Sequence, residues 1–86
     1  MERIPHVLQA EVRGAYSLRL VFDDGLTKTV DLEPFLRGPI FVPVRDPAYF
    51  ARVFVDPELG TIVWPNGADF APETLYELPD VCGDAA

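Results

Sequence analysis

The chain has 86 residues, of which 49% are hydrophobic, and its 14 acidic and 7 basic side chains give a formal net charge of −7. A chain of this length and composition forms a single domain with a small core, which excludes an intrinsically disordered protein. It has no apolar run of about 18 residues and its first residues lack a signal-peptide pattern, so we expect neither a membrane span nor secretion.

The first part of the chain predicts three antiparallel strands. Residues 7–13 partly alternate between apolar and polar side chains, and residues 16–22, YSLRLVF, alternate cleanly. The sequence Asp-Asp-Gly, ending at Gly25, is typical of a tight hairpin turn because glycine tolerates positive φ. Residues 26–32 then return as a third strand rich in threonine and valine. We expect Leu8, Ala10 and Val12 to lie on one side of the first strand. In the second strand we expect Tyr16, Leu18, Leu20 and Phe22 to face one way.

Nine prolines divide the rest of the chain into short pieces. Proline suits the first position of a helix, so we expect a single helical turn at Pro34 and short helices over 47–51 and 72–77. Asp46 has the side chain of a helix N-cap for the first of these helices.

A second hairpin is predicted between these helices, with strands at 52–56 and 60–64. Asp56 and the proline after it fit a type I turn, and Gly60 fits a left-handed position at its end. We expect two apolar faces, the first formed by Phe54, Ile62 and Trp64 and the second by Val53, Val55 and Val63. Such a hairpin must be covered on both sides, either by the last helix with Leu75 and Tyr76 or by a second chain.

Together these elements predict an α+β domain, an antiparallel meander of about five strands with two short helices. We expect residues 1–79 to form one compact domain and residues 80–86 to be a flexible tail. The single cysteine, Cys82, lies in that tail and cannot form an internal disulfide, which favours a reducing cytoplasm.

The charge is unevenly distributed. All seven basic residues lie at or before Arg52, where seven acids balance them, so the whole net charge belongs to the last third. Because phosphate binding requires clustered lysine and arginine, we expect no direct binding of nucleic acid. The acidic third fits a basic protein partner, or it is a solubilising surface.

The stretch TIVWPNGADF, residues 61–70, has two interpretations. In the first it is a turn, in which Trp64 buries its ring, Gly67 takes positive φ and Asp69 accepts hydrogen bonds at the start of the last helix. In the second, the edge of Trp64 together with Asn66 and Asp69 binds a ligand.

Other candidate chemistry is sparse. His6 is the only histidine, Asp23 and Asp24 fit a turn, and no metal-ligand or phosphate-loop spacing occurs. We therefore predict no catalytic, cofactor or metal residues.

Four motifs together resemble the small bacterial family called domain of unknown function 2442. They are Phe22 to Gly25, Val30 to Leu32, the sequence GTIVWPNGAD (60–69) and Leu75 to Glu77. The resemblance covers roughly residues 7–77 and implies an antiparallel α+β domain. It also implies genes beside a second small protein, in a layout similar to toxin–antitoxin pairs, but no established catalytic residues.

Two details of this chain depart from the resemblance. Some relatives carry a C-terminal helix-turn-helix, for which this chain ends too soon. Relatives usually have serine or aspartate before the last helix, where this chain has Ala71.

Two functional hypotheses follow. The first is a protein-interaction domain, antitoxin-like, that binds a basic co-encoded protein or forms a homodimer. The second is a small ligand-binding or enzymatic domain centred on Trp64, Asn66 and Asp69. The predicted partner-binding residues are Asp56, Glu58, Trp64, Asn66, Asp69 and Glu73.

Overall fold

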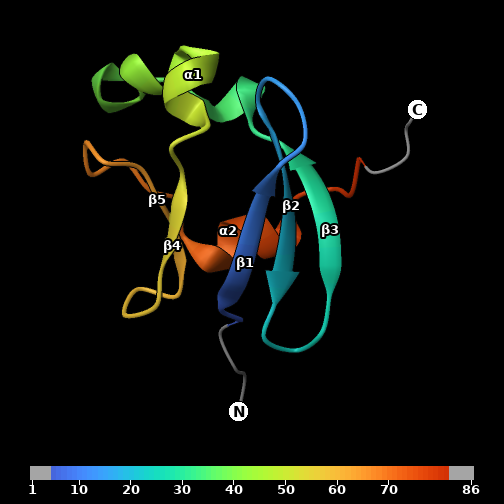
Figure 1. Ribbon diagram of the computed structural model, residues 1–86. Helices are drawn as coiled ribbons and strands as arrows, with labels where there is room; N and C mark the ends of the chain where they lie inside the picture. Colours follow the sequence, from blue (N-terminus) through green and yellow to red (C-terminus); the bar gives the residue numbers. More distant parts are fainter. Residues whose placement is uncertain (1–4, 82–86) are drawn as a thin grey trace.

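The computed structural model describes residues 5–81, which form two antiparallel sheets and several short helices (Figure 1). The first sheet has the order β1-β2-β3, and the second is the hairpin β4-β5. The strands are β1 (Val7–Val12), β2 (Ser17–Phe22), β3 (Thr27–Asp31), β4 (Phe54–Asp56) and β5 (Thr61–Val63). The predicted α+β class with five antiparallel strands is confirmed.

Each helical segment begins at or beside a proline and is three to six residues long. They are the 3-10 turns η1 (Glu33–Phe35), η2 (Pro39–Phe41) and η3 (Pro43–Arg45) and the helices α1 (Pro47–Phe50) and α2 (Pro72–Glu77). Asp46 caps α1, because its Oδ1 accepts a hydrogen bond of 3.0 Å from the backbone N–H of Ala48. Ala71 precedes α2 without any side-chain cap.

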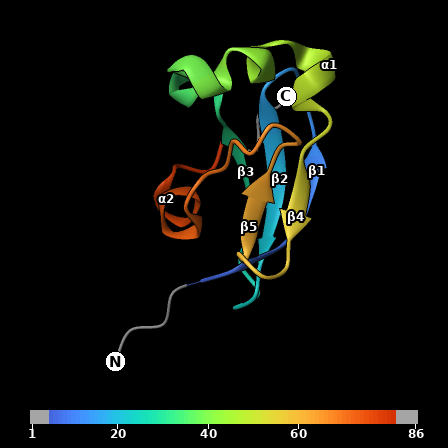
Figure 2. The same cartoon turned by 90° about the vertical axis from the view of Figure 1, so that its left-hand side faces the viewer.

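Helix α2 lies against one face of the three-stranded sheet, and the β4-β5 hairpin lies beside strand β1 (Figures 1 and 2). The 3-10 turns and α1 gather at one end of the molecule (Figure 1). The backbone N–H of Val7 donates to the carbonyl of Gly60 at 2.9 Å and links the two sheets directly. None of the described helices is long and apolar enough to span a bilayer.

The core lies between the first sheet, α2 and the hairpin. Strand β2 contributes Leu18, Leu20 and Phe22, all fully buried, as its alternation predicts. Phe22 packs edge-on against Tyr76 of α2, with 5.0 Å between ring centroids. The buried apolar residues of the core are Val7, Leu18, Leu20, Phe22, Val30, Leu32, Leu36, Val44, Phe50, Ile62, Trp64, Ala68 and Leu75.

Strand β1 departs from its predicted pattern. Val7 pairs with Phe22 and is buried, and the register then shifts before Gln9. The shift leaves Leu8 57% exposed, so the prediction that Leu8 shares one side of the strand with Ala10 and Val12 is wrong. An irregularity of this kind inserts a residue into one strand and turns its side chain away from the alternating pattern.

The faces of the second hairpin were also predicted wrongly. Its register pairs Phe54 with Val63 and Val55 with Ile62, so Phe54 lies on the face opposite to Ile62. Ile62 is fully buried and Phe54 is 47% exposed. The turn fixes this register, since the N–H of Gly60, at φ 68°, donates to the carbonyl of Asp56 at 2.7 Å.

The chain continues beyond α2 along the edge of β3. The N–H of Val81 donates to the carbonyl of Thr29 at 2.8 Å, and the N–H of Thr29 donates to Oδ1 of Asp80 at 3.1 Å. These bonds cover part of the β3 edge. The rest of the predicted tail, including Cys82, lies outside the described residues.

Candidate functional site

Trp64 is the centre of the aromatic core. Its side chain is fully buried, and its indole N–H donates to the carbonyl of Phe50 at 3.0 Å. The rings of Phe41, Phe50 and Phe70 surround it at centroid distances between 5.6 and 6.3 Å. The indole therefore packs and makes its one hydrogen bond inside the domain, and it presents no edge to a ligand.

Asn66 ties the following turn to η2. Its Nδ2 donates to the carbonyl of Ile40 at 2.8 Å, and its Oδ1 accepts from the N–H of Ala68 at 3.1 Å. Gly67 has the positive φ, 91°, that the turn requires. Both ends of the amide are thus engaged, as the turn interpretation expects.

The four acidic candidates have different roles. Oδ1 of Asp56 accepts from the N–H groups of Glu58 and Leu59 at 2.9 and 3.3 Å and so holds the hairpin turn. The side chains of Glu58, Asp69 and Glu73 are exposed. The carboxylate of Asp69 makes no hydrogen bond within residues 5–81, so the prediction that it caps α2 is wrong; its backbone instead bridges to Val63.

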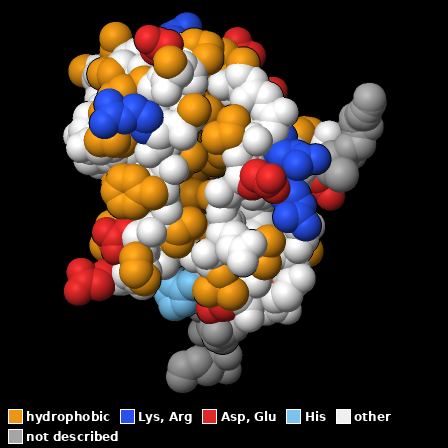
Figure 3. Space-filling model, viewed as in Figure 1, with side chains coloured by type: hydrophobic (Ala, Val, Ile, Leu, Met, Phe, Trp, Pro, Cys, Tyr) orange, Lys and Arg blue, Asp and Glu red, His pale blue; other side chains and the backbone are white. Residues whose placement is uncertain are grey.

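An apolar surface lies where β1 meets the second hairpin. We call it the hairpin surface, and it consists of Leu8, Phe54 and Leu59, which are 57%, 47% and 53% exposed. Figure 3 shows hydrophobic side chains over β4 and in the hollow between β4 and β1, with acidic side chains beside them. Sequence reasoning missed its composition because it assigned Leu8 and Phe54 to the wrong faces.

A hollow of about 300 Å³ adjoins this surface and is lined by Leu8, Val55, Pro57 and Glu58 together with His6 and Asp23. Nδ1 of His6 lies 3.3 Å from Oδ2 of Asp23. Within residues 5–81 no group of three or more His, Cys, Asp or Glu side chains could hold a metal ion.

A buried lysine was not anticipated as a key residue. Lys28 lies on the inner face of β3, and its Nζ donates to the carbonyls of Tyr76 and Leu78, the latter at 2.6 Å. These carbonyls belong to the C-terminal end of α2, where a cation is stabilised. The alternation of β3 could have predicted that Lys28 is buried, since it places Lys28 on the same face as the buried Val30.

The hydroxyl of Tyr76 donates to Oδ2 of Asp24 at 2.5 Å. This hydrogen bond to a carboxylate, followed by burial and the nearby negative charges of Asp24 and Asp23, raises the pKa of Tyr76 above its usual value of 10.0. The predicted hairpin turn at Asp24 is therefore also an anchor for α2.

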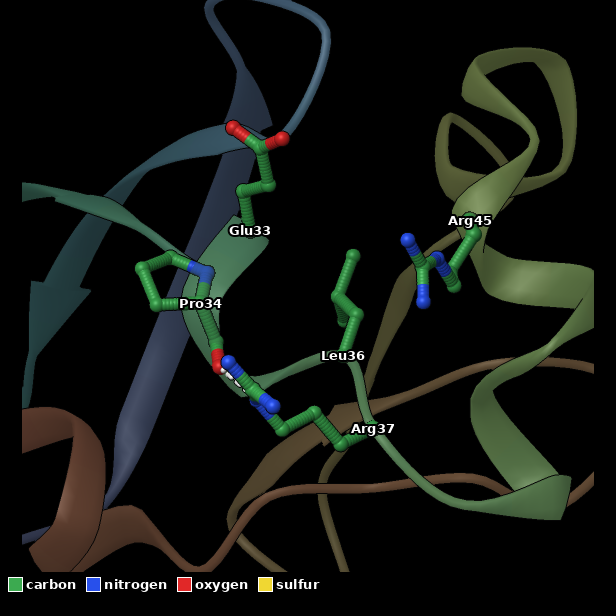
Figure 4. Close-up of a pocket in the computed structure, with 5 residues that line it drawn as sticks. All are labelled: Glu33, Pro34, Leu36, Arg37 and Arg45. Atoms are coloured by element: carbon green, nitrogen blue, oxygen red, sulfur yellow. Dashed lines mark hydrogen bonds between the residues drawn. The ribbon is translucent and has the colours of Figure 1, made fainter.

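A second hollow, of about 290 Å³, lies among the 3-10 turns (Figure 4). It is lined by Glu33, Pro34, Leu36, Arg37 and Arg45. Sequence reasoning did not bring the two arginines together, because the turns that do so have no periodic pattern.

The fold and these surfaces define a small α+β domain built on a tryptophan-centred core, with exposed apolar side chains and no metal cluster among residues 5–81. The chain belongs to the DUF2442 family, described as a protein of unknown function, whose match covers residues 7–78. The resemblance found in the sequence motifs is thus confirmed.

Among solved structures, the chain is similar to one from Nitrosomonas europaea that is described as a "putative DNA binding protein". The two share 29% sequence identity with a TM-score of 0.76. The similarity covers 86% of this chain and 48% of that one, so this chain spans about half the length of its structural relative. No curated protein matches the chain.

This similarity corrects one prediction. The acidic last third and the lack of clustered lysine and arginine predict no direct binding of nucleic acid, yet a protein described as a "putative DNA binding protein" contains a similar fold over 48% of its length. The exclusion is wrong because net charge is a property of the whole chain, whereas folding can gather cations locally. Arg37 and Arg45 are an instance, since they line one hollow of a chain with net charge −7.

Proposed function

We propose that this domain is a protein-interaction module whose partner docks on the hairpin surface. The observation that carries the proposal is the exposure of Leu8, Phe54 and Leu59 on strand β1 and the second hairpin, which pack beside each other. Other large hydrophobic residues are also exposed, namely Val12, Leu26, Phe35, Ile40, Val42 and Val81. Water is excluded from such a surface when a partner covers it, and apolar exposure of this kind is typical of interaction sites.

The partner that fits this surface is basic. Asp56 and Glu58 lie in the turn between β4 and β5, and Asp69 and Glu73 follow the same hairpin in the chain. All the formal net charge of the chain resides after residue 52. A small basic protein encoded beside this one, in an antitoxin-like arrangement, is therefore the first partner to test.

The six predicted partner-binding residues divide into two groups in this proposal. Glu58, Asp69 and Glu73 have exposed carboxylates, and of these Glu58 lies in the turn of the hairpin, where it would meet a partner docked on the hairpin surface. Asp56, Trp64 and Asn66 hold the hairpin and its following turn in place through internal hydrogen bonds. We favour this proposal over the ligand-binding alternative, because the Trp64 side chain is buried and the Asn66 amide already makes two internal hydrogen bonds.

The proposal is tested by co-expression and affinity capture of the neighbouring protein, followed by calorimetry on the purified pair. Phe54→Ser should weaken binding at least about tenfold, because a central apolar contact contributes more than 1 kcal/mol. Val42→Ser is the matched control. Val42 is 64% exposed but lies outside the hairpin surface, between η2 and η3, so this variant should bind the partner with unchanged affinity.

Charge is tested separately by kinetics. Raising the ionic strength from about 0.05 to 0.5 M should slow association several-fold, because the screening length shortens. Glu58→Lys should slow association at low salt, whereas Glu11→Lys on strand β1 makes the same charge change away from the turn and serves as control. Absence of any complex with the neighbouring protein, or equal effects of Phe54→Ser and Val42→Ser, would contradict the proposal.

A second candidate function is participation in DNA binding, which the description of the Nitrosomonas europaea relative favours. It is tested by fluorescence anisotropy of labelled duplex DNA titrated with the domain at several salt concentrations. Binding that weakens linearly with the logarithm of salt concentration would support this function, because contacts to phosphates release counterions. A flat signal at low salt would argue against it.

A further inference from the structure

Two arginines from different turns face one hollow in an otherwise acidic protein. Arg45 is the last residue of η3 and Arg37 follows η1 after one residue. In Figure 4 the guanidinium of Arg45 enters the hollow from one side and the carboxylate of Glu33 stands across from it, with Leu36 between them. The hollow has a volume of about 290 Å³, which suits a small ligand.

The backbone around this hollow is held in place before any ligand binds. Pro34, Pro39 and Pro43 fix φ near the start of the three 3-10 turns. The hydroxyl of Tyr16 donates to the carbonyl oxygen of Arg45 and anchors that residue to the first sheet. Nε of Arg37 donates to the carbonyl of Pro34 at 2.9 Å, the dashed line in Figure 4, which orients its guanidinium. Such preorganisation lowers the entropy lost on binding.

Within the described part of the chain, Nε of Arg37 donates to Pro34, whereas the other guanidinium donors of Arg37 and Arg45 have no hydrogen-bond acceptor. Among residues 5–81, ion pairs engage Arg13 and Arg19, both with Glu11, but neither Arg37 nor Arg45. Two guanidinium groups against the single carboxylate of Glu33 leave the hollow with a positive balance. A guanidinium presents a planar fork of donors, and two forks supply more donors than one carboxylate can accept.

We propose that this hollow binds a small phosphate monoester that carries hydroxyl groups. The phosphate has enough terminal oxygens to accept from both guanidinium forks and the charge to balance both. Pro34 and Leu36 supply an apolar floor for the carbon skeleton, and Glu33 accepts hydrogen bonds from its hydroxyls. This site shares no residue with the hairpin surface and does not depend on the protein-interaction proposal.

The test is a titration of the isotope-labelled full chain, followed by amide and arginine Nε–H resonances in nuclear magnetic resonance spectra. The probes are ribose 5-phosphate, ribose and inorganic phosphate. We expect ribose 5-phosphate to shift the Nε–H signal of Arg37 and the amides of residues 33–37 and 45. We expect inorganic phosphate to bind the same residues more weakly and ribose to leave them unchanged.

Matched variants separate this site from a general effect of charge. Arg45→Gln should lower the affinity for ribose 5-phosphate at least about tenfold. Arg13→Gln makes the same charge change on a residue outside the hollow and should leave this affinity unchanged. Glu33→Gln should strengthen binding of inorganic phosphate by removing a like charge, and Glu11→Gln should not. Amide spectra of each variant without ligand check that the fold is retained.

Several results would overturn the proposal. The first is the absence of shifts at Arg37 with ribose 5-phosphate at millimolar concentration. The second is equal loss of affinity in Arg45→Gln and Arg13→Gln, which would indicate only a general attraction of anions. The third is tighter binding of an oligonucleotide without terminal phosphates than of ribose 5-phosphate, which would assign the hollow to a phosphodiester backbone.

Discussion

Lys28 and Leu78 are joined by a hydrogen bond of 2.6 Å from the ammonium nitrogen of the lysine to the carbonyl oxygen at the end of α2. A second bond from the same nitrogen reaches the carbonyl of Tyr76, and the nitrogen lies 5.6 Å from the centroid of the Tyr76 ring. A cation buried on the inner face of the sheet is thus compensated by the negative end of a helix. This arrangement fixes where α2 lies against β3.

Replacing Lys28 by methionine should lower the free energy of unfolding by about 1–3 kcal/mol, because two carbonyls at the end of α2 lose their donor. The measurement is urea denaturation followed by circular dichroism. Arg19→Met is the control: it makes the same loss of charge on the half-exposed outer face of β2 and should change stability by less than about 0.5 kcal/mol. Equal stability of Lys28→Met and wild type would contradict the proposed role of the lysine.

Trp64→Ala should cost roughly 3–5 kcal/mol, the usual range for a core aromatic. A domain of this size has about 5 kcal/mol of stability in total, so this variant should be unfolded at 37 °C. Trp64→Phe keeps most of the ring packing but loses the hydrogen bond to Phe50, and we expect it to fold with a lower melting temperature. A folded Trp64→Ala that has lost only a binding activity would instead support a ligand site at this tryptophan.

The pKa of Tyr76 makes stability depend on pH in the alkaline range. The hydrogen bond to Asp24 raises this pKa in the folded state, so the unfolded chain loses the tyrosine proton at lower pH than the folded chain. The stabilisation is therefore complete below pH 10 and is lost as pH rises through the folded pKa. Absorbance titration at 295 nm should show one late-titrating tyrosine, which disappears in Tyr76→Phe and titrates earlier in Asp24→Asn. Persistence of the late titration in Tyr76→Phe would assign it to another tyrosine.

Gly60 has a steric constraint in addition to its backbone conformation. Its φ is 68°, and a Cβ built at this position would lie 2.3 Å from Cδ2 of His6. Gly25, at φ 91°, has no atom within 4 Å of such a Cβ and isolates the effect of φ alone. We expect Gly60→Ala to lower the free energy of unfolding by about 1–2 kcal/mol because of the positive φ, and to lower it further because of the clash with His6.

The measurement is thermal unfolding of the glycine variants, and Gly25→Ala is the control. Gly25→Ala should be less destabilising than Gly60→Ala, and the double change His6→Ala with Gly60→Ala should recover the difference. If the two glycine variants melt at the same temperature, the contact with His6 has no energetic consequence.

Local patterns predicted much of this fold. The alternation at Leu18, Leu20 and Phe22 identified the inner face of β2, and the prolines placed α1 and α2 almost to the residue. Asp46 and Gly60 were assigned correctly because capping and positive φ depend on immediate neighbours. These features require no knowledge of the rest of the chain.

Features that depend on strand register or on packing between distant segments could not be predicted from the sequence. The faces of β4 depend on where the turn begins, and a shift of one residue moved Phe54 to the outer face. The irregularity in β1 similarly exposed Leu8. Arg37 and Arg45 line the same hollow only because successive 3-10 turns fold back on each other, and no periodic pattern in the sequence predicts that path. The candidate surfaces therefore came from the structure, whereas the internal role of Trp64 was available from the sequence.

The bond between Lys28 and Leu78 also has a consequence for biosynthesis, because the two residues are 50 positions apart. At roughly 5–20 residues per second, several seconds separate the synthesis of β3 from that of its helical cover. During that interval Lys28 has no helix end to which it can donate, and its ammonium group stays hydrated. The inner face of the first sheet therefore gains its helical cover, and Lys28 its two acceptors, only after α2 has left the ribosome.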